Sequence, residues 1–478
     1  APPPDGTADQ RVVRGAVMIT NLKPYPKMKD SGVEWLGEVP EHWEVRRLQT
    51  ISDMRVSNVD KHTKEDETPV RLCNYVDVYN NDRISEQMDF MRATATSEEI
   101  ELFRLAANDV LITKDSESWD DIGVPALVTK SANDFISGYH LALLRAFTSL
   151  LSGDYLFRAL QSKTVAYQFH VGAKGVTRYG LSHAGIKSVW LPLPPLPEQA
   201  AIVRYLDYVD RRIRRYIREK RKLIKLLTEQ KQAIIHRAVT RGLPAAAAAQ
   251  AGLDPNVPFK PSGVEWLGQV PEHWEVRKLR FDFRYAKGSR AAELTNEYIG
   301  ANPGPFPVFS GQTENNGLMG SISWHEFDFE NDVILVTTVG ARAMSTRLIS
   351  GAFSLSQNCA IIVPRDNRTS TSYYEMVMHR LFAYEKASIS LIMQPSLRFS
   401  DLNRFYIPAP PFSEQAAIVE HLNEPTADID TAIARAKREI ELLGEYRTRL
   451  IADVVTGKLD VRGYNVVEES DDTAPEGG

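Results

Sequence analysis

One eighteen-residue peptide occurs twice in the chain. SGVEWLGEVPEHWEVRRL begins at Ser31, SGVEWLGQVPEHWEVRKL begins at Ser262, and sixteen of the eighteen positions are identical. A second pair, LPLPPLPEQAAIVRYL from Leu191 and IPAPPFSEQAAIVEHL from Ile407, shares ten of sixteen positions. The spacings of 231 and 216 residues are too long for a solenoid repeat. The chain is therefore predicted to hold two copies of one module: the repeated peptide, a variable domain, a proline-rich exit and a long helix.

A long helix is predicted after each proline-rich exit. Gly242 should end the first helix, and Pro425 should break or restart the second. A helix with one narrow apolar stripe needs a partner, so the two helices are predicted to pack on each other. The alternative is that each packs on its own domain. The heptad seam of the first helix, interrupted at Lys220 and Gln230, comprises Leu206, Val209, Ile213, Tyr216, Lys220, Leu223, Leu227, Gln230 and Ile234. That of the second comprises Ile429, Ile433, Ala436, Ile440, Leu443, Arg447 and Leu450.

The segments between the repeats alternate short β-rich runs with turn residues and a few helical stretches, which is typical of compact α+β domains. The chain is expected to divide into a disordered or tag-like N-terminus (1–24), the repeated peptide with the first variable domain (25–196), the first long helix (197–243), a linker (244–261), the repeated peptide with the second variable domain (262–412), the second long helix (413–459) and an acidic disordered tail (460–478).

Composition excludes several classes of protein. The chain lacks an uninterrupted apolar run of about 18 residues, which a membrane-spanning helix needs. Cys73 and Cys359 are its only cysteines, which argues against a disulfide scaffold and favours a reducing, cytoplasmic location. The net charge of −5 does not by itself indicate nucleic-acid binding.

Catalytic signatures are absent from the sequence. It has neither a phosphate-binding loop nor a dinucleotide fingerprint, and its ten histidines show no zinc-site spacing. GYHLAL around His140 lacks the serine or cysteine elbow that a nucleophilic triad needs. The chain is therefore predicted to have no catalytic residue and no metal site, and to bind and position other molecules.

Positive charge gathers on the first long helix. Between Asp210 and Lys231 there are ten basic and three acidic residues, whereas Asp428 to Arg449 holds five of each. Such a stripe is either the solvated side of a coiled coil or a surface for DNA phosphates or an acidic partner. The candidate contacts are Arg211, Arg214, Arg218 and Lys222.

The repeated SGVEWLGEVPEHWEV peptide, the PLPPLPEQ and PAPPFSEQ exits and the long helix after each resemble the specificity subunit (HsdS) of a type I restriction–modification system. The resemblance covers the chain from about Tyr25 to Leu459. It implies two target recognition domains, each reading one half of a split DNA site, and two long antiparallel helices whose coiled coil sets the spacing. A protein–protein scaffold without its own DNA specificity is the alternative.

The resemblance also implies partners. Double-stranded DNA, two methyltransferase (HsdM) subunits and restriction/translocase (HsdR) subunits are expected. S-adenosylmethionine is expected in the methyltransferase subunits, and no cofactor is expected in this chain. A self-contained methylation or restriction enzyme would need catalytic motifs that the sequence lacks.

By position relative to the family's loop patterns, five loop segments are expected to contact DNA through polar and cationic side chains. In the first domain these residues are Lys114, Ser116, Glu117 and Trp119 of TKDSESW, and Lys174, Thr177, Arg178 and Tyr179 of AKGVTRYG. In the second domain they are Gln312, Glu314, Asn315 and Asn316 of SGQTENN, Arg342 of GARA, and Gln394, Ser396 and Arg398 of QPSLR. Loop chemistry alone is the alternative, since the same residue types build turns.

The tryptophans of the repeated peptide, Trp35, Trp43, Trp266 and Trp274, are candidate docking anchors for a partner or for the other half of the chain. If the second copy packs near the end of the first long helix, the first copy should pack near the end of the second. The N- and C-terminal regions would then lie close together. Ordinary core tryptophans are the alternative.

Overall fold

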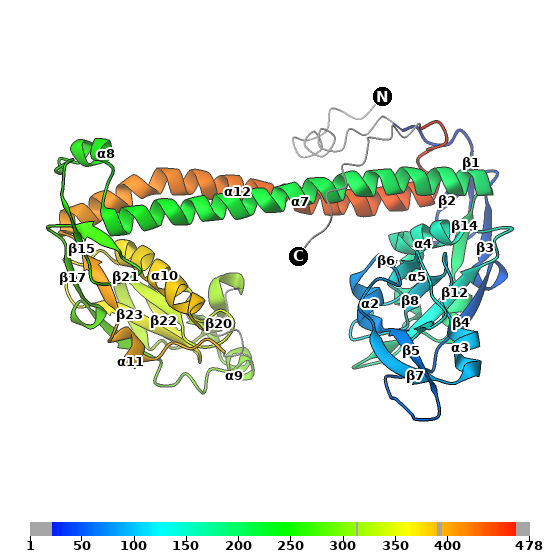
Figure 1. Ribbon diagram of the computed structural model, residues 1–478, viewed down its shortest axis with the longest axis horizontal. Helices are drawn as coiled ribbons and strands as arrows, with labels where there is room; N and C mark the ends of the chain where they lie inside the picture. Colours follow the sequence, from blue (N-terminus) through cyan, green and yellow to red (C-terminus); the bar gives the residue numbers. More distant parts are fainter. Residues whose placement is uncertain (1–21, 312–313, 390–393, 465–478) are drawn as a thin grey trace. The chain divides into compact units, whose positions relative to one another are not determined.

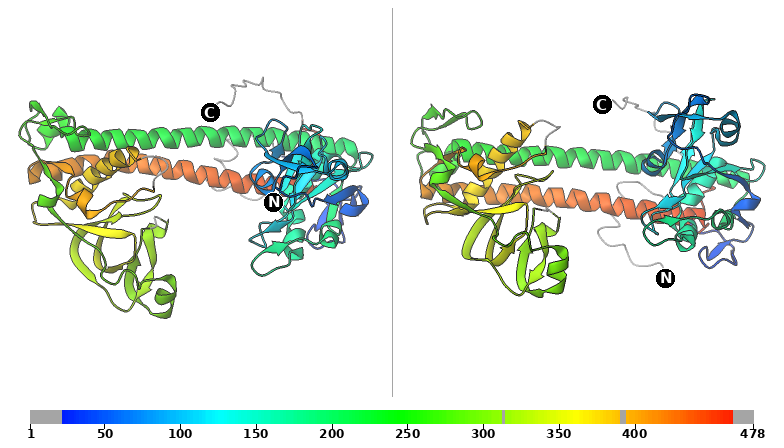
Figure 2. Two further views of the ribbon diagram at one scale, coloured as in Figure 1. Left: turned by 60° about the horizontal axis from the view of Figure 1, so that its bottom comes forward. Right: turned by 90° about the horizontal axis from the view of Figure 1, so that it is seen from below.

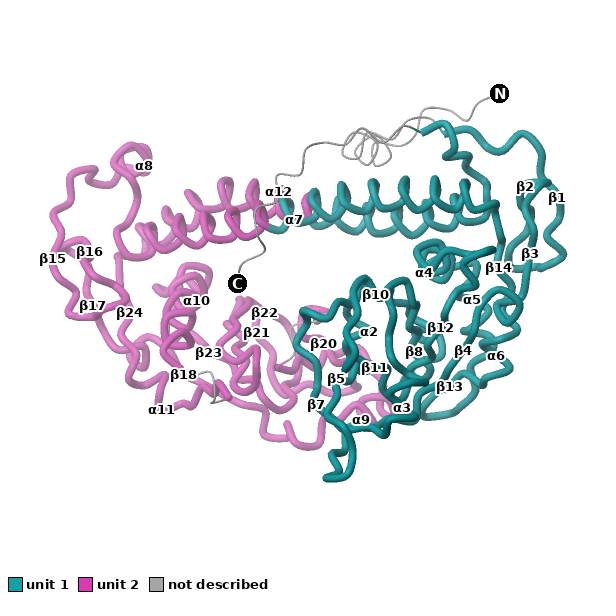
Figure 3. Tube along the Cα trace, turned by 45° about the vertical axis from the view of Figure 1, so that its right-hand side comes forward, with its two compact units in different colours: residues 1–221, 437–478 teal, residues 222–436 magenta. Residues whose placement is uncertain are grey.

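The computed structural model describes residues 22–311, 314–389 and 394–464. These residues fall into two compact units, 1–221 with 437–478 and 222–436 (Figure 3). Each unit contains one α+β domain and a stretch of both long helices, α7 (Leu196–Arg241) and α12 (Phe412–Val455). The predicted fold class, two α+β domains with two long paired helices from an internal duplication, is confirmed.

The domain of unit 1 is built on a five-stranded sheet of order β4-β12-β8-β10-β6, with a second sheet of order β11-β5-β7. Val110, Leu111, Ile112 and Thr113 of β8 are all buried, which explains the uninterrupted apolar run in the sequence. The elements of this domain are β4 (Ser52–Val56), β5 (Thr68–Cys73), α2 (Tyr75–Asn80), β6 (Arg83–Ile84), β7 (Met91–Ala95), α3 (Ser97–Phe103), β8 (Val110–Thr113), β9 (Asp115–Ser116), β10 (Pro125–Val128), β11 (Phe135–Ser137), β12 (Leu141–Ala146), α4 (Gly153–Gln161), α5 (Lys163–Gly172), β13 (Tyr179–Gly180) and α6 (His183–Lys187).

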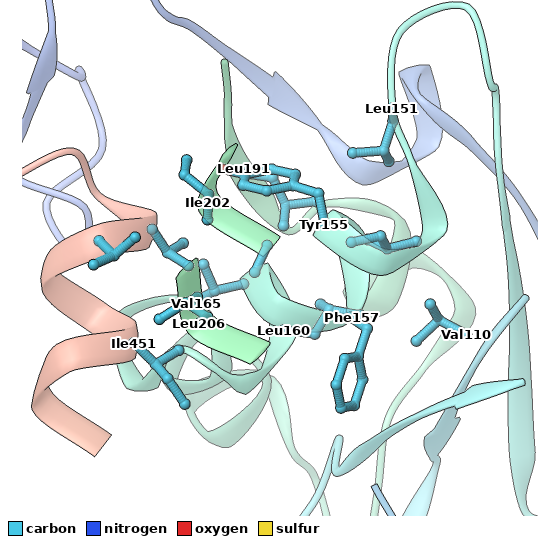
Figure 4. Close-up of a cluster of buried hydrophobic side chains, with 14 of the residues drawn as sticks. Val110, Leu151, Tyr155, Phe157, Leu160, Val165, Leu191, Ile202, Leu206 and Ile451 are labelled. Atoms are coloured by element: carbon cyan, nitrogen blue, oxygen red, sulfur yellow. The ribbon is translucent and has the colours of Figure 1, made fainter. Parts of the chain in front are cut away.

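Helix α4 joins this domain to the long helices. Its N-cap Ser152 accepts a hydrogen bond from the backbone of Tyr155, and Ser152 itself donates its backbone N–H to Gln199 Oε1 of α7 (2.9 Å). One apolar core then runs from Tyr155 and Leu160 to Leu206 of α7 and Ile451 of α12 (Figure 4). Because each such aliphatic side chain contributes about 1.5–3 kcal/mol when fully buried, this shared core ties the domain firmly to both helices.

The domain of unit 2 is built on one six-stranded sheet of order β18-β23-β21-β22-β19-β20. Helix α10 (Thr371–Ala387) packs along β21 and β22, as the views in Figure 2 show. The short strands and the helical stretch that the sequence predicts between the repeats are found here, with α10 as the long helix of this domain. The elements are η2 (Leu279–Phe281), β18 (Phe283–Ala286), α9 (Asn296–Ala301), β19 (Pro303–Phe309), η3 (Glu314–Gly317), β20 (Leu318–Ile322), β21 (Phe327–Thr337), β22 (Thr346–Leu355), β23 (Cys359–Pro364), α10 and α11 (Phe399–Leu402).

The two long helices run side by side and antiparallel in unit 1 (Figure 1). Asp210 of α7 pairs with Arg447 of α12, and further along α7 Lys220 pairs with Glu439, which lies earlier in α12. Seam residues Val209, Ile213 and Leu443, among others, are buried, whereas Leu223 is 40% exposed. The seam prediction is therefore correct for these residues and wrong for Leu223.

The expected break at Pro425 does not occur, because α12 continues through it. Proline removes one backbone donor and crowds the preceding turn, which costs about 3 kcal/mol in an isolated helix. Here the buried side chains of Leu422 and Ile429 hold the helix on both sides of the proline. The hydroxyl of Thr426 also donates to the carbonyl of Leu422 (2.7 Å). Tertiary packing thus overrides the local signal.

The repeated peptide forms the same small framework in both units. In unit 1, β1 (Met28–Asp30) pairs with β2 (Glu38–Pro40), and β3 (Glu44–Arg47), which leads into η1 (Leu48–Thr50), pairs with β14 (Trp190–Leu193) of the proline-rich exit. In unit 2, β15 (Phe259–Pro261) pairs with β16 (Gln269–Pro271), and β17 (Glu275–Lys278) pairs with β24 (Tyr406–Ala409). The short helix α8 (Ala245–Gln250) lies in the linker before β15.

The ends of the described chain are packed rather than free. The backbone N–H of Asp460 donates to the carbonyl of Lys23 (2.8 Å), Val461 is 1% exposed, and Tyr464 makes an edge contact with Tyr205. The prediction that residues 22–24 and 460–464 lack structure is therefore wrong, because apolar side chains in these short segments join the core of unit 1. The remainder of both predicted disordered segments lies outside the described residues.

Candidate nucleic-acid interface

The two loops predicted to contact DNA in the first domain are joined in the structure. β9 and β13 pair antiparallel, with Tyr179 opposite Ser116, and the backbone N–H of Leu181 donates to the carbonyl of Lys114 (2.9 Å). Segments about 60 residues apart in the sequence therefore present one surface. Glu117, Trp119, Lys174, Thr177 and Arg178 are exposed on it.

The other predicted residues of these loops are less exposed to solvent. Lys114 and Tyr179 are half-buried. Ser116 is buried, and its hydroxyl accepts a hydrogen bond from the backbone N–H of Ser118 (3.2 Å). Ser116 therefore shapes the loop, and the exposed side chains around it are the ones placed to meet a ligand.

Asp115 and His140, which the sequence did not single out for DNA contact, lie at the centre of this surface. The carboxylate of Asp115 accepts hydrogen bonds from His140 Nδ1 (2.6 Å) and Lys114 Nζ (2.9 Å). Partial burial would raise the pKa of Asp115, but these two donors outweigh it and hold the pKa below its ordinary value. With Nδ1 donating, His140 Nε2 accepts from the guanidinium of Arg178 (3.3 Å). The exposed Arg178 is thus oriented by a hydrogen-bonded chain.

In the second domain, the GARA and QPSLR loops lie side by side. Gly340 donates its backbone N–H to the carbonyl of Pro395 (3.2 Å), and Leu397 donates to Thr338 (2.8 Å). The predicted residues Arg342, Gln394, Ser396 and Arg398 are all exposed here. Two loops far apart in the sequence again form one polar and cationic surface.

The SGQTENN segment begins beside the same edge of the sheet. The hydroxyl of Thr337, at the end of β21, donates to the carbonyl of Gly311 (3.2 Å). Asn315 and Asn316 are exposed and have φ values of 47° and 51°, a left-handed conformation that asparagine tolerates better than most residues. Gln312 lies outside the described residues, and so does the side chain of Glu314.

The candidate phosphate contacts of α7 differ from one another. Arg211, Arg214, Arg218 and Lys222 are all exposed, yet Arg214 forms an ion pair with Asp82 of the first domain and Arg218 lies 3.7 Å from Glu219. Arg214 therefore also serves to hold the domain on the helix.

A buried charge network attaches the first domain to both long helices. Arg158 of α4 is 3% exposed and pairs with Asp207 and, at 2.5 Å, with Asp210 of α7. Asp210 also accepts from Arg447 of α12 (2.8 Å), which in turn reaches Asp82 (3.2 Å). Burial would raise the pKa of Asp210, but Arg447 and Arg158 hold it below its ordinary value.

The tryptophans of the repeated peptide divide into two kinds. Trp43 and Trp274 are fully buried, and each indole N–H donates to a glutamate in the first turn of a long helix, Glu198 or Glu414 (3.0 Å in both units). They anchor the chain to itself. Trp266 is 9% exposed, whereas Trp35 is 38% exposed and packs on Tyr167, so Trp35 is the one most open to a partner.

The repeated peptide also meets the ends of the long helices, as the duplication predicts. A side chain at Gly242, just after α7, would contact Pro271 and Trp274, and one at Gly457, just after α12, would collide with Pro40 and approach Trp43. Both glycines have φ above +70°, the left-handed conformation that ends helices. The second copy of the peptide therefore packs at the end of the first helix, and the first copy at the end of the second.

Comparison with known families identifies this architecture. Residues 40–226 and 271–442 each match the family described as the type I restriction modification DNA specificity domain. The chain belongs to this family. It is a DNA-recognition subunit with two specificity domains, and the scaffold alternative is not favoured.

Relatives of this specificity subunit match it along most of their length. It is 22% identical to a putative type I restriction enzyme MjaX specificity subunit of Methanocaldococcus jannaschii, over 89% of this chain and 96% of the relative. It is also 22% identical to the MjaVIII specificity subunit of the same organism, over 89% and 95%. A solved structure from a type I R-M system shares the fold, with a TM-score of 0.60, 18% identity and coverage of 88% of this chain and 99% of that one.

Three further findings concern the described residues of the specificity subunit. In the described parts of the chain, no group of three or more histidine, cysteine, aspartate or glutamate side chains is arranged to hold a metal ion. A search of the same residues finds no helix that is long and apolar enough to span a membrane. Cys73 and Cys359 are buried free thiols.

Proposed function

We propose that the chain recognises a two-part DNA sequence, with one domain for each part. The observation that carries this proposal is that each domain gathers its exposed polar and cationic side chains on paired loops. In unit 1 the pairing is between β9 and β13, and in unit 2 it is between residues 338–340 and 395–397. Such side chains read base edges and contact phosphates, so two such surfaces suit two half-sites.

The chain is further proposed to act without catalysis of its own. In this proposal it positions two methyltransferase (HsdM) subunits and restriction/translocase (HsdR) subunits, and S-adenosylmethionine binds in the methyltransferase subunits. The names of its relatives as type I restriction enzyme specificity subunits support this role. The antiparallel long helices would set the spacer between the two half-sites, in the way that dimer geometry sets half-site spacing in other DNA-binding proteins.

The decisive experiment is selection from a random double-stranded DNA library by the purified chain, with and without its methyltransferase partner. The expected result is an enriched sequence of two fixed parts separated by a spacer of constant length. Failure to enrich a split sequence in either condition would refute the proposal.

Variants of the first domain then test the assignment of half-sites. Arg178→Gln should relax or weaken recognition of one half-site by about 1–3 kcal/mol if this guanidinium reads a base. Lys130→Gln is the matched control, because Lys130 is exposed at the opposite end of the β8–β10 hairpin. Equal effects of both changes, or a change at both half-sites, would contradict the assignment.

A further inference from the structure

The two glutamates in the first turns of the long helices, Glu198 and Glu414, differ in the number of hydrogen-bond donors that they receive. In unit 1, Glu198 Oε2 accepts from the Tyr25 hydroxyl (2.9 Å) and from Trp43 Nε1 (3.0 Å). Its other oxygen, Oε1, lies 2.7 Å from His42 Nε2 and 3.8 Å from Arg462 Nη1. The guanidinium of Arg462 also lies over the Tyr25 ring, 4.6 Å from its centre. Both carboxylate oxygens of Glu198 are therefore engaged.

In unit 2, Glu414 keeps only half of these partners. Trp274 Nε1 (3.0 Å) and His273 Nε2 (2.8 Å) both bind Oε2. Glu414 is 7% exposed, and among the described residues none donates a hydrogen bond to its Oε1. Glu414 instead lines an open cavity, so its Oε1 is available to a donor from outside the chain.

Two donors of unit 1, Tyr25 and Arg462, have no counterpart at Glu414 among the described residues of unit 2, and the Tyr25 position lies within the repeated framework. The spacing of the repeat places Asn256 where unit 1 has Tyr25. The backbone follows the same path, since Glu41 donates to the carbonyl of Lys27 (3.0 Å) and Glu272 donates to that of Pro258 (2.8 Å). The side chain of Asn256 is exposed and does not line the space beside Glu414.

A cavity of about 670 Å³ occupies this place in unit 2. Its walls include four proline rings, the imidazole of His273 and the carboxylate of Glu414. Arg237 and Arg241, from the last turns of α7, also line it, so guanidinium groups are available here as Arg462 is in unit 1. The prolines are Pro244, Pro255, Pro258 and Pro271.

We propose that this cavity binds a tyrosine side chain presented by an extended segment of a partner protein. The phenol would donate to the carboxylate of Glu414, as Tyr25 donates to that of Glu198. The ring would pack against the proline faces, and an arginine of α7 would cover the ring. Unit 1 performs the same recognition with its own Tyr25, which supplies the template for the ligand. The lining holds three carboxylates, Asp254, Glu272 and Glu414, against two arginines, and this negative balance favours a segment whose tyrosine is flanked by lysine or arginine. This inference goes beyond DNA recognition and does not rest on it.

The test uses the full chain and a labelled peptide with the sequence of residues 22–29, LKPYPKMK, which presents a tyrosine between lysines. Fluorescence anisotropy should show saturable binding at one site. A peptide with phenylalanine in place of the tyrosine should bind at least tenfold more weakly, because it cannot donate to Glu414.

Two variants locate the site. Asn256→Tyr should fill the cavity from within the chain, as Tyr25 does in unit 1, and weaken peptide binding at least tenfold. Asn256→Ser is the matched control and should bind like the unaltered chain, while thermal melting verifies that both variants are folded. The proposal is overturned if the chain does not bind the peptide at 1 mM, if both peptides bind equally, or if Asn256→Tyr binds like the unaltered chain.

Discussion

Replacing Arg158 with methionine tests whether the buried charge network holds the first specificity domain on the long helices. The guanidinium is 3% exposed and serves both Asp207 and Asp210, of which Asp210 is itself 5% exposed. Removing one member of a buried ion pair typically costs about 3–5 kcal/mol, because the remaining charge stays buried. Methionine is the natural comparison, since Met376 stands at the corresponding position of α10 when the N-caps Ser152 and Ser370 are aligned.

The assay should resolve the two units, because a chain with several domains need not unfold in one step. Hydrogen exchange read peptide by peptide meets this need, and the amides of α4 and of the first half of α7 report on the joint. A loss of 3–5 kcal/mol corresponds to roughly 100-fold to 4,000-fold faster exchange, up to the limit set by unfolding of the whole unit.

Two controls sharpen the result. Arg83→Met removes a partner of Asp207 that is 43% exposed, so exchange should rise by less than about fivefold. The double variant Arg158→Met with Asp210→Thr reproduces the residues of unit 2, where Thr426 stands in place of Asp210, and should recover most of the protection. If the single variant exchanges no faster than the Arg83 control, the network does not hold the domain in place.

Three other outcomes follow from the same contacts. Because the folded state lowers the pKa of Asp210, its ionised carboxylate stabilises unit 1 fully above pH 3.8, and this stabilisation is lost as the pH falls through the lower folded pKa. In an acid titration, the Asp210→Thr variant should therefore lose less stability than the unaltered chain. Trp43→Phe should lower the free energy of unfolding by about 1.5–3 kcal/mol, because the buried indole loses its hydrogen bond to the carboxylate of Glu198. Trp35→Phe should lower it by less than about 0.5 kcal/mol, and equal losses in thermal melting would contradict the division of roles. If Arg211 and Arg218 contact DNA phosphates, changing both to glutamine should reduce the slope of log affinity against log salt by about 1.8, and an unchanged slope would assign them to a solvated face or a protein contact.

The repeats made the architecture predictable from the sequence. Two nearly identical peptides and two matching exits predicted two similar frameworks, and the heptad seams predicted that the long helices pair. The errors arose where tertiary packing decides. Pro425 is tolerated because Leu422 and Ile429 are buried on either side of it, and Asp460–Tyr464 is ordered because Val461 and Tyr464 reach a core that lies far away in the sequence.

The loops of the candidate site could be predicted from the sequence, but the hydrogen bonds that join their residues could not. The resemblance to the family's loop patterns identified the 114–119 and 174–179 segments, and the structure shows that the pairing of β9 with β13 joins them. Asp115 and His140 gave no such signal, because their importance lies in hydrogen bonds between β9 and the segment before β12. The acidic partners of the basic stripe, such as Asp82 for Arg214, also come from another part of the chain and could not be read from the charge count.

The ends of the two long helices make the same contacts with the repeated peptide, but the contacting residues are separated by very different lengths of chain. Gly242 meets Trp274 after a connection of roughly 30 residues, whereas Gly457 meets Trp43 only after roughly 400. Closing the longer loop costs about 2 kcal/mol more in chain entropy, at roughly 0.6 kcal/mol for each doubling of length. The additional bonds of unit 1 made by Tyr25, Asp460 and Arg462 occur at this longer closure. These contacts therefore hold the two chain segments of unit 1 together without a covalent bond. Their free energy offsets the larger chain-entropy cost of closing the longer loop, a cost that unit 2, with its short linker, does not carry.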